Sequence, residues 1–587
     1  MKKFFTLWCC WALLFPGALF AQSANFKTGK SIDIFHQVLR EVAIFYVDTV
    51  QVDQLVEAGI AAMLEQLDPY TEFIPEEENE SIELLTTGSY GGVGATIHRK
   101  PTGIVFLEPY ENYPAARAGL VPGDEILEVD GVSTATLTVG ECSNMMKGKP
   151  DTQVRFKIRK VNAGEVIDLT LRRERIHFSD IAWYGMVGEG VGYIQIAGFT
   201  LGGSNDLRRA FLELKSGGNL SGLILDLRSN GGGLMEEAVN MLGMFLPRGT
   251  EVVSAKGRYP QQDVTYKTKE EPLDIELPIV VLVNRGSASS SEILAGALQD
   301  LDRGVVVGTR TFGKGLVQQI RPLNYNSQLK MTTAKYYIPS GRCVQAIDYS
   351  HRNEDGSVGV IPDSLINEFK TKNGRLVYDG GGITPDERIE GQGYSRIAIE
   401  LLSRNLIWDY AVQYRINHLE VASPEQFALT DSEYEAFIAF MEQQEFDGRS
   451  ATEVMLEQLL VMAKREGFDS KVVEQLGELK NMTAGDKAQD LLRHKTEIIR
   501  LLEEEICCGY YYQKGRIRSM LRHDVQLERA IEILSSPFEY KSLLTPPATS
   551  TSTGFVNNFL EKSKLVNPVY QTKTVKNSSG TAVYSIG

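Results

Sequence analysis

The spacing of hydrophobic positions changes twice along the first third of the chain. Between residues 30 and 76, apolar side chains such as Ile34 and Val38 recur at helical intervals, which predicts helices closed by Leu67 to Tyr70. From Gly88 to about Arg175, short β-branched runs alternate with glycine turns and predict a small strand-rich domain. The predicted strands are Val93 to Ile97, Ile104 to Leu107, Glu125 to Val129, Val154 to Arg159 and Val166 to Leu171.

From Val191 onward the pattern alternates between strands and helices. Apolar strands are predicted at Val191 to Ile196, Gly222 to Leu227, Ile279 to Val283 and Val305 to Val307. Helices are predicted between them at Asp206 to Leu214, Met235 to Phe245 and Glu292 to Gln299. This alternation is typical of an α/β layer, whose chemistry lies in the loops at the strand ends.

These patterns predict a multidomain α/β protein. Its parts are N-terminal helices, a strand-rich module, an α/β core and a charged C-terminal helical region, followed by a tail rich in Ser, Thr, Pro and Asn. The predicted boundaries are 1–21 for an export signal, 27–84 for the N-terminal helical segment, 85–175 for the strand-rich domain, 176–395 for the α/β core, 396–544 for the C-terminal helical region and 545–587 for a flexible tail.

The first residues have the pattern of an export signal. Lys2 and Lys3 precede an apolar run from Phe4 to Phe20, and Ala21-Gln22 is a small-residue exit. Cleavage is expected near Gln22, with an uncleaved membrane anchor as the alternative. Four scattered cysteines would remain, too few for a disulfide framework in a chain of this length. We therefore expect an exported protein of the periplasm or cell envelope.

Charge and histidine placement narrow the chemistry. The 76 acidic and 61 basic residues give a net charge of -15, so no basic field is available for nucleic acid. None of the seven histidines lies between Val191 and Gln345. A Ser-His-Asp hydrolase built within that segment is thereby excluded, and no His/Cys cluster there has metal-ligand spacing. Any nucleophile in this core needs another base.

Three loops rich in serine or glycine follow predicted strands of the core. Residues 284–292 place hydroxyls at the start of a helix, where unpaired N–H groups favour developing negative charge. An ordinary N-cap serine is the structural alternative. Residues 226–233 end in three glycines, which can turn N–H groups toward an oxyanion or form a plain tight turn. Because the loops follow strands of one layer, we expect a ligand site at their common edge.

The third loop, residues 308–315, matches the Gly-x4-Gly-Lys spacing of a phosphate-binding loop. Gly315 stands where that motif requires a hydroxyl for Mg2+, which opposes a nucleotide site. A structural turn is the second interpretation. The third is a lysine buried between apolar strands, where the neutral amine can act as general base because burial disfavours the charged form.

Taken in order, these motifs resemble those of the C-terminal processing peptidases, or tail-specific proteases, which are serine peptidases with a Ser/Lys dyad. The resemblance covers residues 30–390, and it implies an enzyme without metal or other cofactor. It rests on Leu67-Asp68-Pro69-Tyr70, Gly119 to Asp124, Val129-Asp130-Gly131, Asp226 to Gly233, Gly286 to Glu292, Phe312 to Gly315, Pro339 to Arg342 and Gly380 to Asp386.

The resemblance implies roles for individual residues of the core. Ser289 would be the nucleophile, Lys314 the general base, and Gln318 the residue that orients the lysine. The family usually has Ala at the position of Ser290, so the choice among the neighbouring hydroxyls stays open. The candidates for the nucleophile are Ser287, Ser289, Ser290 and Ser291.

The resemblance also implies two binding elements. The oxyanion would be held by the N–H of Ser290 and by that of Gly231 or Gly232. The strand-rich domain resembles a PDZ module of the circularly permuted bacterial kind, with a strand edge for β-augmentation. Its carboxylate-binding loop, for which a glycine-rich hairpin is the structural alternative, would use the N–H groups of Gly92, Val93, Gly94 and Ala95.

The sequence therefore predicts an exported serine endopeptidase that recognises protein or peptide substrates by a free, preferably apolar C-terminus. No nucleic acid, nucleotide, metal or cofactor is expected, and a homo-oligomer stays open. A catalytically silent PDZ adaptor is the alternative from another class, and a serine at 289 together with a lysine at 314 opposes it. A P-loop nucleotidase is the third hypothesis.

Overall fold

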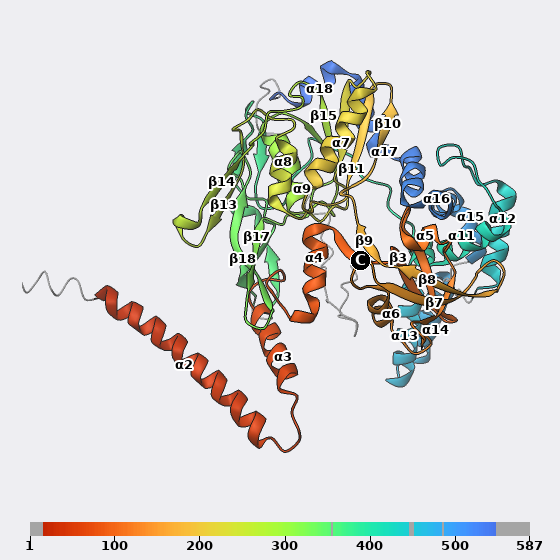
Figure 1. Ribbon diagram of the computed structural model, residues 1–587, viewed down its shortest axis with the longest axis horizontal. Coiled ribbons are helices and arrows are strands. Elements are labelled where there is room, and N and C mark those ends of the chain that lie inside the picture. The colour runs from red at the N-terminus through yellow and green to blue at the C-terminus, as the bar shows by residue number, and fades with distance from the viewer. Residues whose placement is uncertain (1–15, 354–355, 445–450, 484–486, 547–587) are drawn as a thin grey trace, which may run out of the picture. The chain divides into compact units, whose positions relative to one another are not determined.

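The structure is a computed structural model that describes residues 16–353, 356–444, 451–483 and 487–546 (Figure 1). The chain divides into two compact units. One holds the described residues up to Glu76 together with Gln318–Thr332, and the other holds Glu77–Val317 and everything from Thr333 onward. Across the described residues, no helix combines the length and apolarity needed to cross a membrane.

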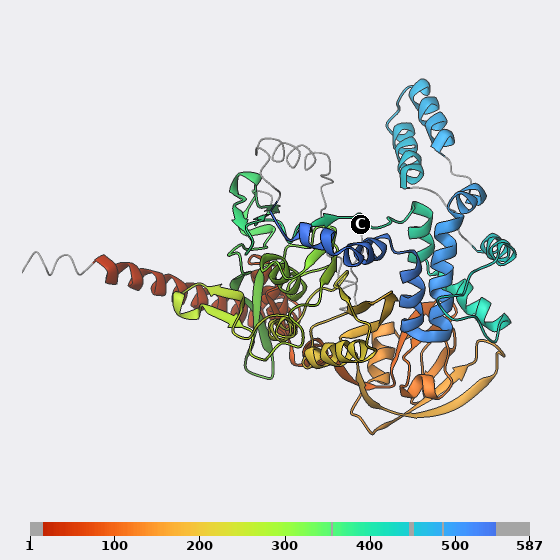
Figure 2. The ribbon, with the colours of Figure 1, turned by 90° about the horizontal axis from the view of Figure 1, so that it is seen from above.

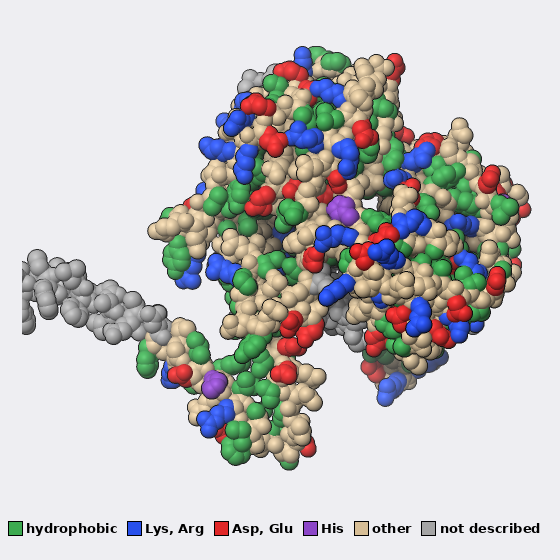
Figure 3. Space-filling model, viewed as in Figure 1, with side chains coloured by type: hydrophobic (Ala, Val, Ile, Leu, Met, Phe, Trp, Pro, Cys, Tyr) green, Lys and Arg blue, Asp and Glu red, His purple; other side chains and the backbone are tan. Residues whose placement is uncertain are grey.

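The first unit contains the predicted N-terminal helices, α2 (Pro16–Phe45) and α3 (Val52–Glu65). Helix α2 continues through the predicted cleavage site at Ala21-Gln22, whereas residues 1–15 of the predicted signal lie outside the described residues. The apolar face predicted for α2 is exposed, with Ile34 at 50% and Val38 at 57%. Figure 3 shows hydrophobic side chains along this helical arm.

The helices close at Leu67 to Tyr70 as predicted, but the residues that follow form a strand, where the sequence pattern predicts helix as far as residue 76. The carboxylate of Asp68 accepts the N–H groups of Tyr70 and Thr71, both at 2.9 Å, and so turns the chain. Strand β1 (Glu72–Ile74) then pairs antiparallel with Gln328–Lys330, at the start of β18 (Gln328–Tyr337).

The second unit begins with the strand-rich domain. Its antiparallel sheet has the order β3-β4-β5-β7-β8, and β6 (Val132–Ser133) pairs with β5. Strand β3 is an edge, and helix α6 (Val139–Met146) packs beside it over a core that includes Phe106 and Phe156. The strands are β3 (Ala95–Lys100), β4 (Gly103–Pro109), β5 (Glu125–Val129), β7 (Gln153–Arg159) and β8 (Val166–Arg172), and β2 (Ser89–Gly92) pairs with β9 (Glu174–His177) where the chain enters and leaves the domain.

The α/β core is built on a six-stranded sheet in the order β10-β11-β12-β15-β16-β23. Only β10 runs antiparallel to its neighbour. Alternate side chains of one strand face opposite sides, so both faces need a cover. The strands are β10 (Ile181–Gly188), β11 (Val191–Ile196), β12 (Gly222–Asp226), β15 (Ile279–Val283), β16 (Val305–Gly308) and β23 (Glu387–Arg388).

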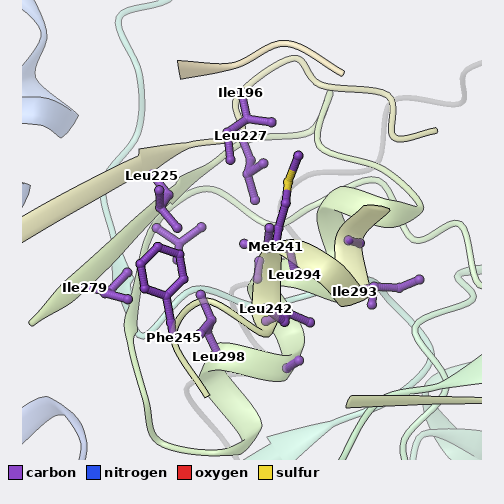
Figure 4. Packing of buried hydrophobic residues seen from close by; sticks show 14 of the residues in the cluster. Ile196, Leu225, Leu227, Met241, Leu242, Phe245, Ile279, Ile293, Leu294 and Leu298 are labelled. Atoms are coloured by element: carbon purple, nitrogen blue, oxygen red, sulfur yellow. The ribbon is translucent and has the colours of Figure 1, made fainter. Parts of the chain in front are cut away.

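Helices α7 (Gly203–Ser216), α8 (Met235–Leu242) and α9 (Ser290–Asp300) cover one face of this sheet. Figure 4 shows Leu225 and Ile279 of the strands against Phe245 and Leu298, and all four are fully or almost fully buried. The predicted strands and helices of the core are thus found in their places.

The opposite face of the sheet is covered by helices that lie far along the sequence from its strands. Helices α17 (Val525–Ser535) and α18 (Pro537–Leu543) pack Leu527, Ile533 and Tyr540 against Val280 and Leu282 of β15. The core therefore extends beyond the predicted boundary at residue 395.

The remaining C-terminal helices form a separate apolar core around Leu401, Tyr434 and Leu502. The hairpin of α13 and α14 extends away from the other helices of this group (Figure 2, light blue). The helices are α10 (Arg396–Ser403), α11 (Leu406–Asn417), α12 (Asp431–Glu442), α13 (Ala451–Arg465), α14 (Ser470–Thr483), α15 (Lys487–Arg493) and α16 (Lys495–Met520).

Shorter elements complete the described chain, and the predicted flexible tail lies outside it from residue 547. They are α4 (Asn79–Thr87), α5 (Pro114–Arg117), β13 (Glu251–Gly257), β14 (Val264–Lys267), β17 (Leu316–Pro322), β19 (Ile347–Arg352), β20 (Val358–Val360), β21 (Glu368–Lys370) and β22 (Leu376–Tyr378).

Candidate active site

The three loops singled out in the sequence leave the same edge of the core sheet. Strands β12, β15 and β16 are parallel neighbours, so their carboxyl ends lie side by side. The loops also bond to one another: the N–H of Ala288 donates to the carbonyl of Asn230 at 3.0 Å, and the N–H of Phe312 donates to the carbonyl of Ser287 at 3.0 Å. The expected gathering of the three loops is therefore found.

Ser289 occupies the strained turn between β15 and α9. Its φ of 56° and ψ of -115° lie outside the regions that a non-glycine residue ordinarily adopts. It stands at the N-cap position of α9, as the structural alternative proposed, but a usual N-cap residue has extended backbone angles. Strain of this kind persists only where the surroundings enforce it, and it is frequent at functional sites.

The other three serines of this loop are buried, and their hydroxyls are used by the fold. The hydroxyl of Ser287 donates to the carbonyl of Leu227 at 2.8 Å, and that of Ser290 donates to the carbonyl of Gly233 at 2.9 Å. Ser291 donates to the carbonyl of Asn230, also at 2.9 Å. Ser289 alone among the four is only half-buried. The geometry therefore favours Ser289 over its neighbours as a reactive hydroxyl.

Lys314 lies in a loop that passes close to the chain at Val344–Ala346. A side chain at Gly313 would bring its Cβ within 2.4 Å of the Cβ of Ala346, and φ of Gly313 is +88°, so only glycine fits there. The lysine itself is half-buried. A phosphate-binding loop leads into a helix, whereas this loop leads into strand β17, so the P-loop interpretation is not supported.

The carboxylate of Glu292 joins the serine loop to the lysine loop. One oxygen accepts the N–H of Ser289 at 2.9 Å and the N–H of Lys314 at 2.8 Å. The other accepts the hydroxyl of Thr311 at 2.6 Å and the N–H of Gly313 at 2.8 Å. The side chain is fully buried, and this burial raises the pKa of Glu292 to about 7 although all four donors favour the ionised form.

The hydroxyl of Tyr336 makes the complementary contact on the carbonyl side. It lies 2.6 Å from the carbonyl oxygen of Lys314 and 3.1 Å from that of Ser289. Tyr336 is almost fully buried. Glu292 and Tyr336 together therefore fix the backbones of both predicted dyad residues.

The two predicted oxyanion donors of the glycine turn, Gly231 and Gly232, differ in the hydrogen bonds of their N–H groups. The N–H of Gly232 donates to the side-chain oxygen of Asn230 at 2.9 Å. A Cβ on Gly232 would lie 2.9 Å from the nitrogen of Ser290, so this glycine permits the close approach of the two loops. The N–H of Ser290 belongs to the first residue of α9, where helical N–H groups have no intrahelical acceptor. The geometry thus favours Gly231 with Ser290.

Gln318 belongs to the first unit, and its side chain is hydrogen-bonded to a residue of that same unit. Its amide nitrogen donates to the hydroxyl of Thr332 at 3.1 Å, and the N–H of Thr332 donates to the hydroxyl of Thr71 at 3.2 Å. Thr71 is in turn bonded to Asp68. Asp68 of the Leu67 to Tyr70 motif therefore holds the side chain of Gln318 indirectly, through Thr71 and Thr332.

The predicted carboxylate-binding loop precedes edge strand β3. The carbonyls of Val93 and Gly94 accept the N–H groups of Ala115 and Tyr110, both at 2.9 Å. Among the hydrogen bonds of the described residues, none uses the N–H of Val93 or Gly94 as donor. The loop thus has the N–H polarity that an anion requires.

Two contributors to this site escaped the sequence interpretation. Glu292 was visible only as a helix-capping partner three residues after Ser289, a signal that also occurs at ordinary helix starts. Tyr336 carries no local signal, because it approaches from a strand 47 residues away.

Family models match three parts of the chain. They are peptidase family S41 over residues 190–366, a PDZ domain over residues 105–160, and a probable PDZ-protease C-terminal helical domain over residues 397–534. These matches confirm the predicted fold class, with its PDZ module, peptidase core and helical C-terminal domain.

Two named relatives support the same family, and one solved structure is also similar to part of the chain. The chain is 34% identical over 345 residues to a carboxy-terminal-processing protease of Bartonella bacilliformis, which covers 58% of this chain and 76% of that one. It is 34% identical over 316 residues to a carboxyl-terminal-processing protease of Synechocystis, covering 53% and 70%. A solved photosystem II D1 C-terminal processing protease is 28% identical and covers 61% of this chain and 92% of its own, at a TM-score of 0.33.

Replacing each serine separately tests the assignment of the reactive hydroxyl. We expect Ser287→Ala, Ser290→Ala and Ser291→Ala each to lower the free energy of unfolding by about 0.5–1.5 kcal/mol, because each removes one hydrogen bond between a serine hydroxyl and a backbone carbonyl of the neighbouring loop. All three should still be labelled by a fluorophosphonate, whereas Ser289→Ala should not. Loss of labelling in a folded Ser290→Ala protein with labelling retained in Ser289→Ala would move the nucleophile.

The raised pKa of Glu292 predicts a pH-dependent stability difference. The folded-state pKa of about 7 exceeds the ordinary carboxyl value of 4.5, so the folded protein binds this proton more tightly than the unfolded chain. Wild type should therefore lose stability relative to Glu292→Gln as the pH rises from about 4.5 to 7, by up to roughly 3 kcal/mol. Thermal unfolding of both proteins across this range measures the difference. A constant difference would show that the pKa of Glu292 is not raised.

Proposed function

The chain belongs to peptidase family S41 and is a serine-type peptidase, and we propose that it is an exported endopeptidase that recognises protein C-termini and cleaves by a Ser289–Lys314 dyad. The observation that carries the proposal is the joint clamping of these two residues by Glu292 and Tyr336. A dyad requires two groups from different loops to keep a fixed separation, and this clamp supplies that constraint.

In the proposed acylation step, the hydroxyl oxygen of Ser289 attacks the scissile carbonyl carbon. The neutral amine of Lys314 accepts the hydroxyl proton, and the resulting ammonium then donates it to the leaving amine as the C–N bond breaks. Water attacks the acyl-enzyme in the second half of the reaction, again with Lys314 as base, and releases the new carboxyl end together with the free serine.

The tetrahedral oxyanion would be held by backbone N–H groups. We assign this role to Ser290, at the start of α9, and to Gly231 of the glycine turn. Both N–H groups are carried by segments that the fold already fixes, so little reorganisation is needed as charge develops. Gln318, whose amide nitrogen donates to Thr332, would orient the lysine, as the family resemblance implies.

The PDZ module would recognise the free C-terminus. A substrate tail can add to edge strand β3 as a further strand, with its terminal carboxylate at the N–H groups of Gly92, Val93, Gly94 and Ala95. Ala95 and Ile97 at this edge are apolar and pack on the domain core, which favours an apolar terminal side chain. The location in the periplasm or cell envelope rests on the export pattern at the N-terminus.

Substitution of the dyad tests the proposed chemistry. Ser289→Ala and Lys314→Ala should each lower kcat for peptide hydrolysis by at least about 1,000-fold, because the two groups act as one unit. Lys314→Arg should fail equally, since a guanidinium stays protonated and cannot accept a proton. Lys256→Ala, which removes an amine from strand β13, serves as the matched control. Turnover by Lys314→Ala near that of the control would refute the dyad.

The role of the C-terminus is tested on the substrate side. One unfolded protein should be cleaved fastest when it ends in Ala-Ala, more slowly when it ends in Asp-Asp, and more slowly again as a C-terminal amide, because the amide loses the charge-assisted contact with the loop. A short peptide blocked at both ends reports on the chemistry alone. Equal rates for all three proteins would remove C-terminal recognition from the proposal and leave the dyad intact.

A further inference from the structure

The glycine turn is held at its start by a buried ionic cluster that joins the core sheet to helix α17. Arg228 opens this turn directly after β12, and its side chain is only 17% exposed. Its guanidinium bonds to Asp226 through Nε, at 3.0 Å to both carboxylate oxygens. The hydroxyl of Tyr193 donates to the same carboxylate at 2.6 Å. One side of the guanidinium is therefore held by the sheet itself.

The other side of the guanidinium is held by helix α17. Its terminal nitrogens lie 2.5 Å from the carboxylate of Asp524 and 3.0 Å from the side-chain oxygen of Gln526. Asp524 is also the N-cap of α17, because its second oxygen accepts the N–H groups of Gln526 and Leu527 at 3.0 and 3.1 Å. The two oxygens of this carboxylate thus have separate roles, since one caps the helix and the other contacts Arg228.

The position of Arg228 is transmitted to the turn that it opens. The next residue, Ser229, has a φ of +59° and donates its N–H to the side chain of Asn284 at 2.8 Å. Asn230 then accepts the N–H of Ala288, and Gly231 follows. Only three peptide bonds separate Arg228 from the N–H of Gly231, so a shift of the arginine backbone displaces that N–H.

We propose that Asp524 is a positioning residue for catalysis, which fixes the oxyanion-binding turn by holding Arg228 from the side opposite Asp226. The inference rests on the proposed function, in which Gly231 donates to the oxyanion. It gives the C-terminal helices a part in the chemistry: the helix that covers the second face of the core sheet also sets the geometry of the turn at the edge of that sheet.

The planar guanidinium explains why two partners are needed. Asp226 bonds to Nε and to one terminal nitrogen, Nη2, but it does not reach Nη1 and leaves the second N–H of Nη2 to another acceptor. Asp524 and Gln526 complete the set, and the amide nitrogen of Gln526 is itself tied to the carbonyl of Ile389 at 2.7 Å. Asp524 is therefore part of a fixed frame rather than a mobile surface counter-ion.

The substitution Asp524→Asn separates the two roles of this side chain. Asparagine is as good an N-cap as aspartate, so the cap of α17 is retained while the charged contact with Arg228 is lost. Asp431→Asn is the matched control, since Asp431 also stands at a helix start and pairs with a cation, Lys495. Unlike Asp524, its side chain is 87% exposed, and its partner Lys495 belongs to α16 and not to the glycine turn.

We expect kcat of Asp524→Asn to fall about ten-fold with KM within two-fold of wild type, because a displaced donor affects the transition state more than the bound substrate. The inhibition constant of a substrate-like peptide aldehyde, whose tetrahedral adduct places an oxyanion at the same N–H groups, should rise by the same factor. Activity is measured at a temperature where circular dichroism shows all variants folded. Asp431→Asn should match wild type in every measurement.

Two results would overturn the inference. In one, kcat and aldehyde affinity of Asp524→Asn equal those of Asp431→Asn. In the other, kcat falls while aldehyde affinity stays unchanged, which would place the effect away from the oxyanion. Ser289→Ala is assayed in parallel: if it retains turnover, the proposed function itself fails, whereas an inactive Ser289→Ala beside a fully active Asp524→Asn removes only the role of Asp524.

Discussion

A fully buried carboxylate must find hydrogen-bond donors inside the protein, and Glu292 obtains them from both loops that carry the proposed dyad. This requirement works in two directions. The loops satisfy the carboxylate, and the carboxylate fixes the spacing of the loops. Since interactions inside the protein are screened less than in water, loss of any one donor is costly, and the arrangement is correspondingly rigid. The strained backbone of Ser289 can persist because its N–H is one of these donors.

Two motifs on which the family resemblance rests prove to be structural supports for the elements around this carboxylate. In the segment Gly380 to Asp386, the N–H of Ile383 donates to the hydroxyl of Thr311 at 2.6 Å, and that hydroxyl donates to Glu292. In the segment Pro339 to Arg342, the guanidinium of Arg342 bonds to Asp300 at 2.8 Å and so holds the far end of α9. Both motifs therefore act on the dyad through the helix or loop that carries it.

The sequence was sufficient for elements whose pattern is local. Strand β15 has the predicted bounds, because it is a continuous apolar run between turn residues and is buried on both faces. Strand β11, which is mostly apolar and mostly buried, has the predicted bounds as well. The gathering of three loops at one edge also followed from the alternation of strands and helices. Tertiary contacts could not be predicted from the sequence, because nothing local to Tyr336 or Asp524 indicates that each reaches the site from a distant part of the chain. The choice of Ser289 over its three neighbouring serines likewise depended on the hydrogen bonds that the other three hydroxyls make.

The C-terminal helices link the two functional parts of the second unit. The indole N–H of Trp408 in α11 donates to the carbonyl of Leu107 in β4 at 3.1 Å, and Asp409 pairs with Lys100 of edge strand β3. Further along the same helical region, Asp524 contacts Arg228 at the glycine turn. Strands β3 and β4 of the PDZ sheet and the glycine turn of the peptidase core are therefore both held by helices of the same C-terminal region. Any movement of the PDZ sheet against the peptidase core must either break these contacts or carry the helices with it, so the PDZ sheet and the glycine turn are mechanically connected.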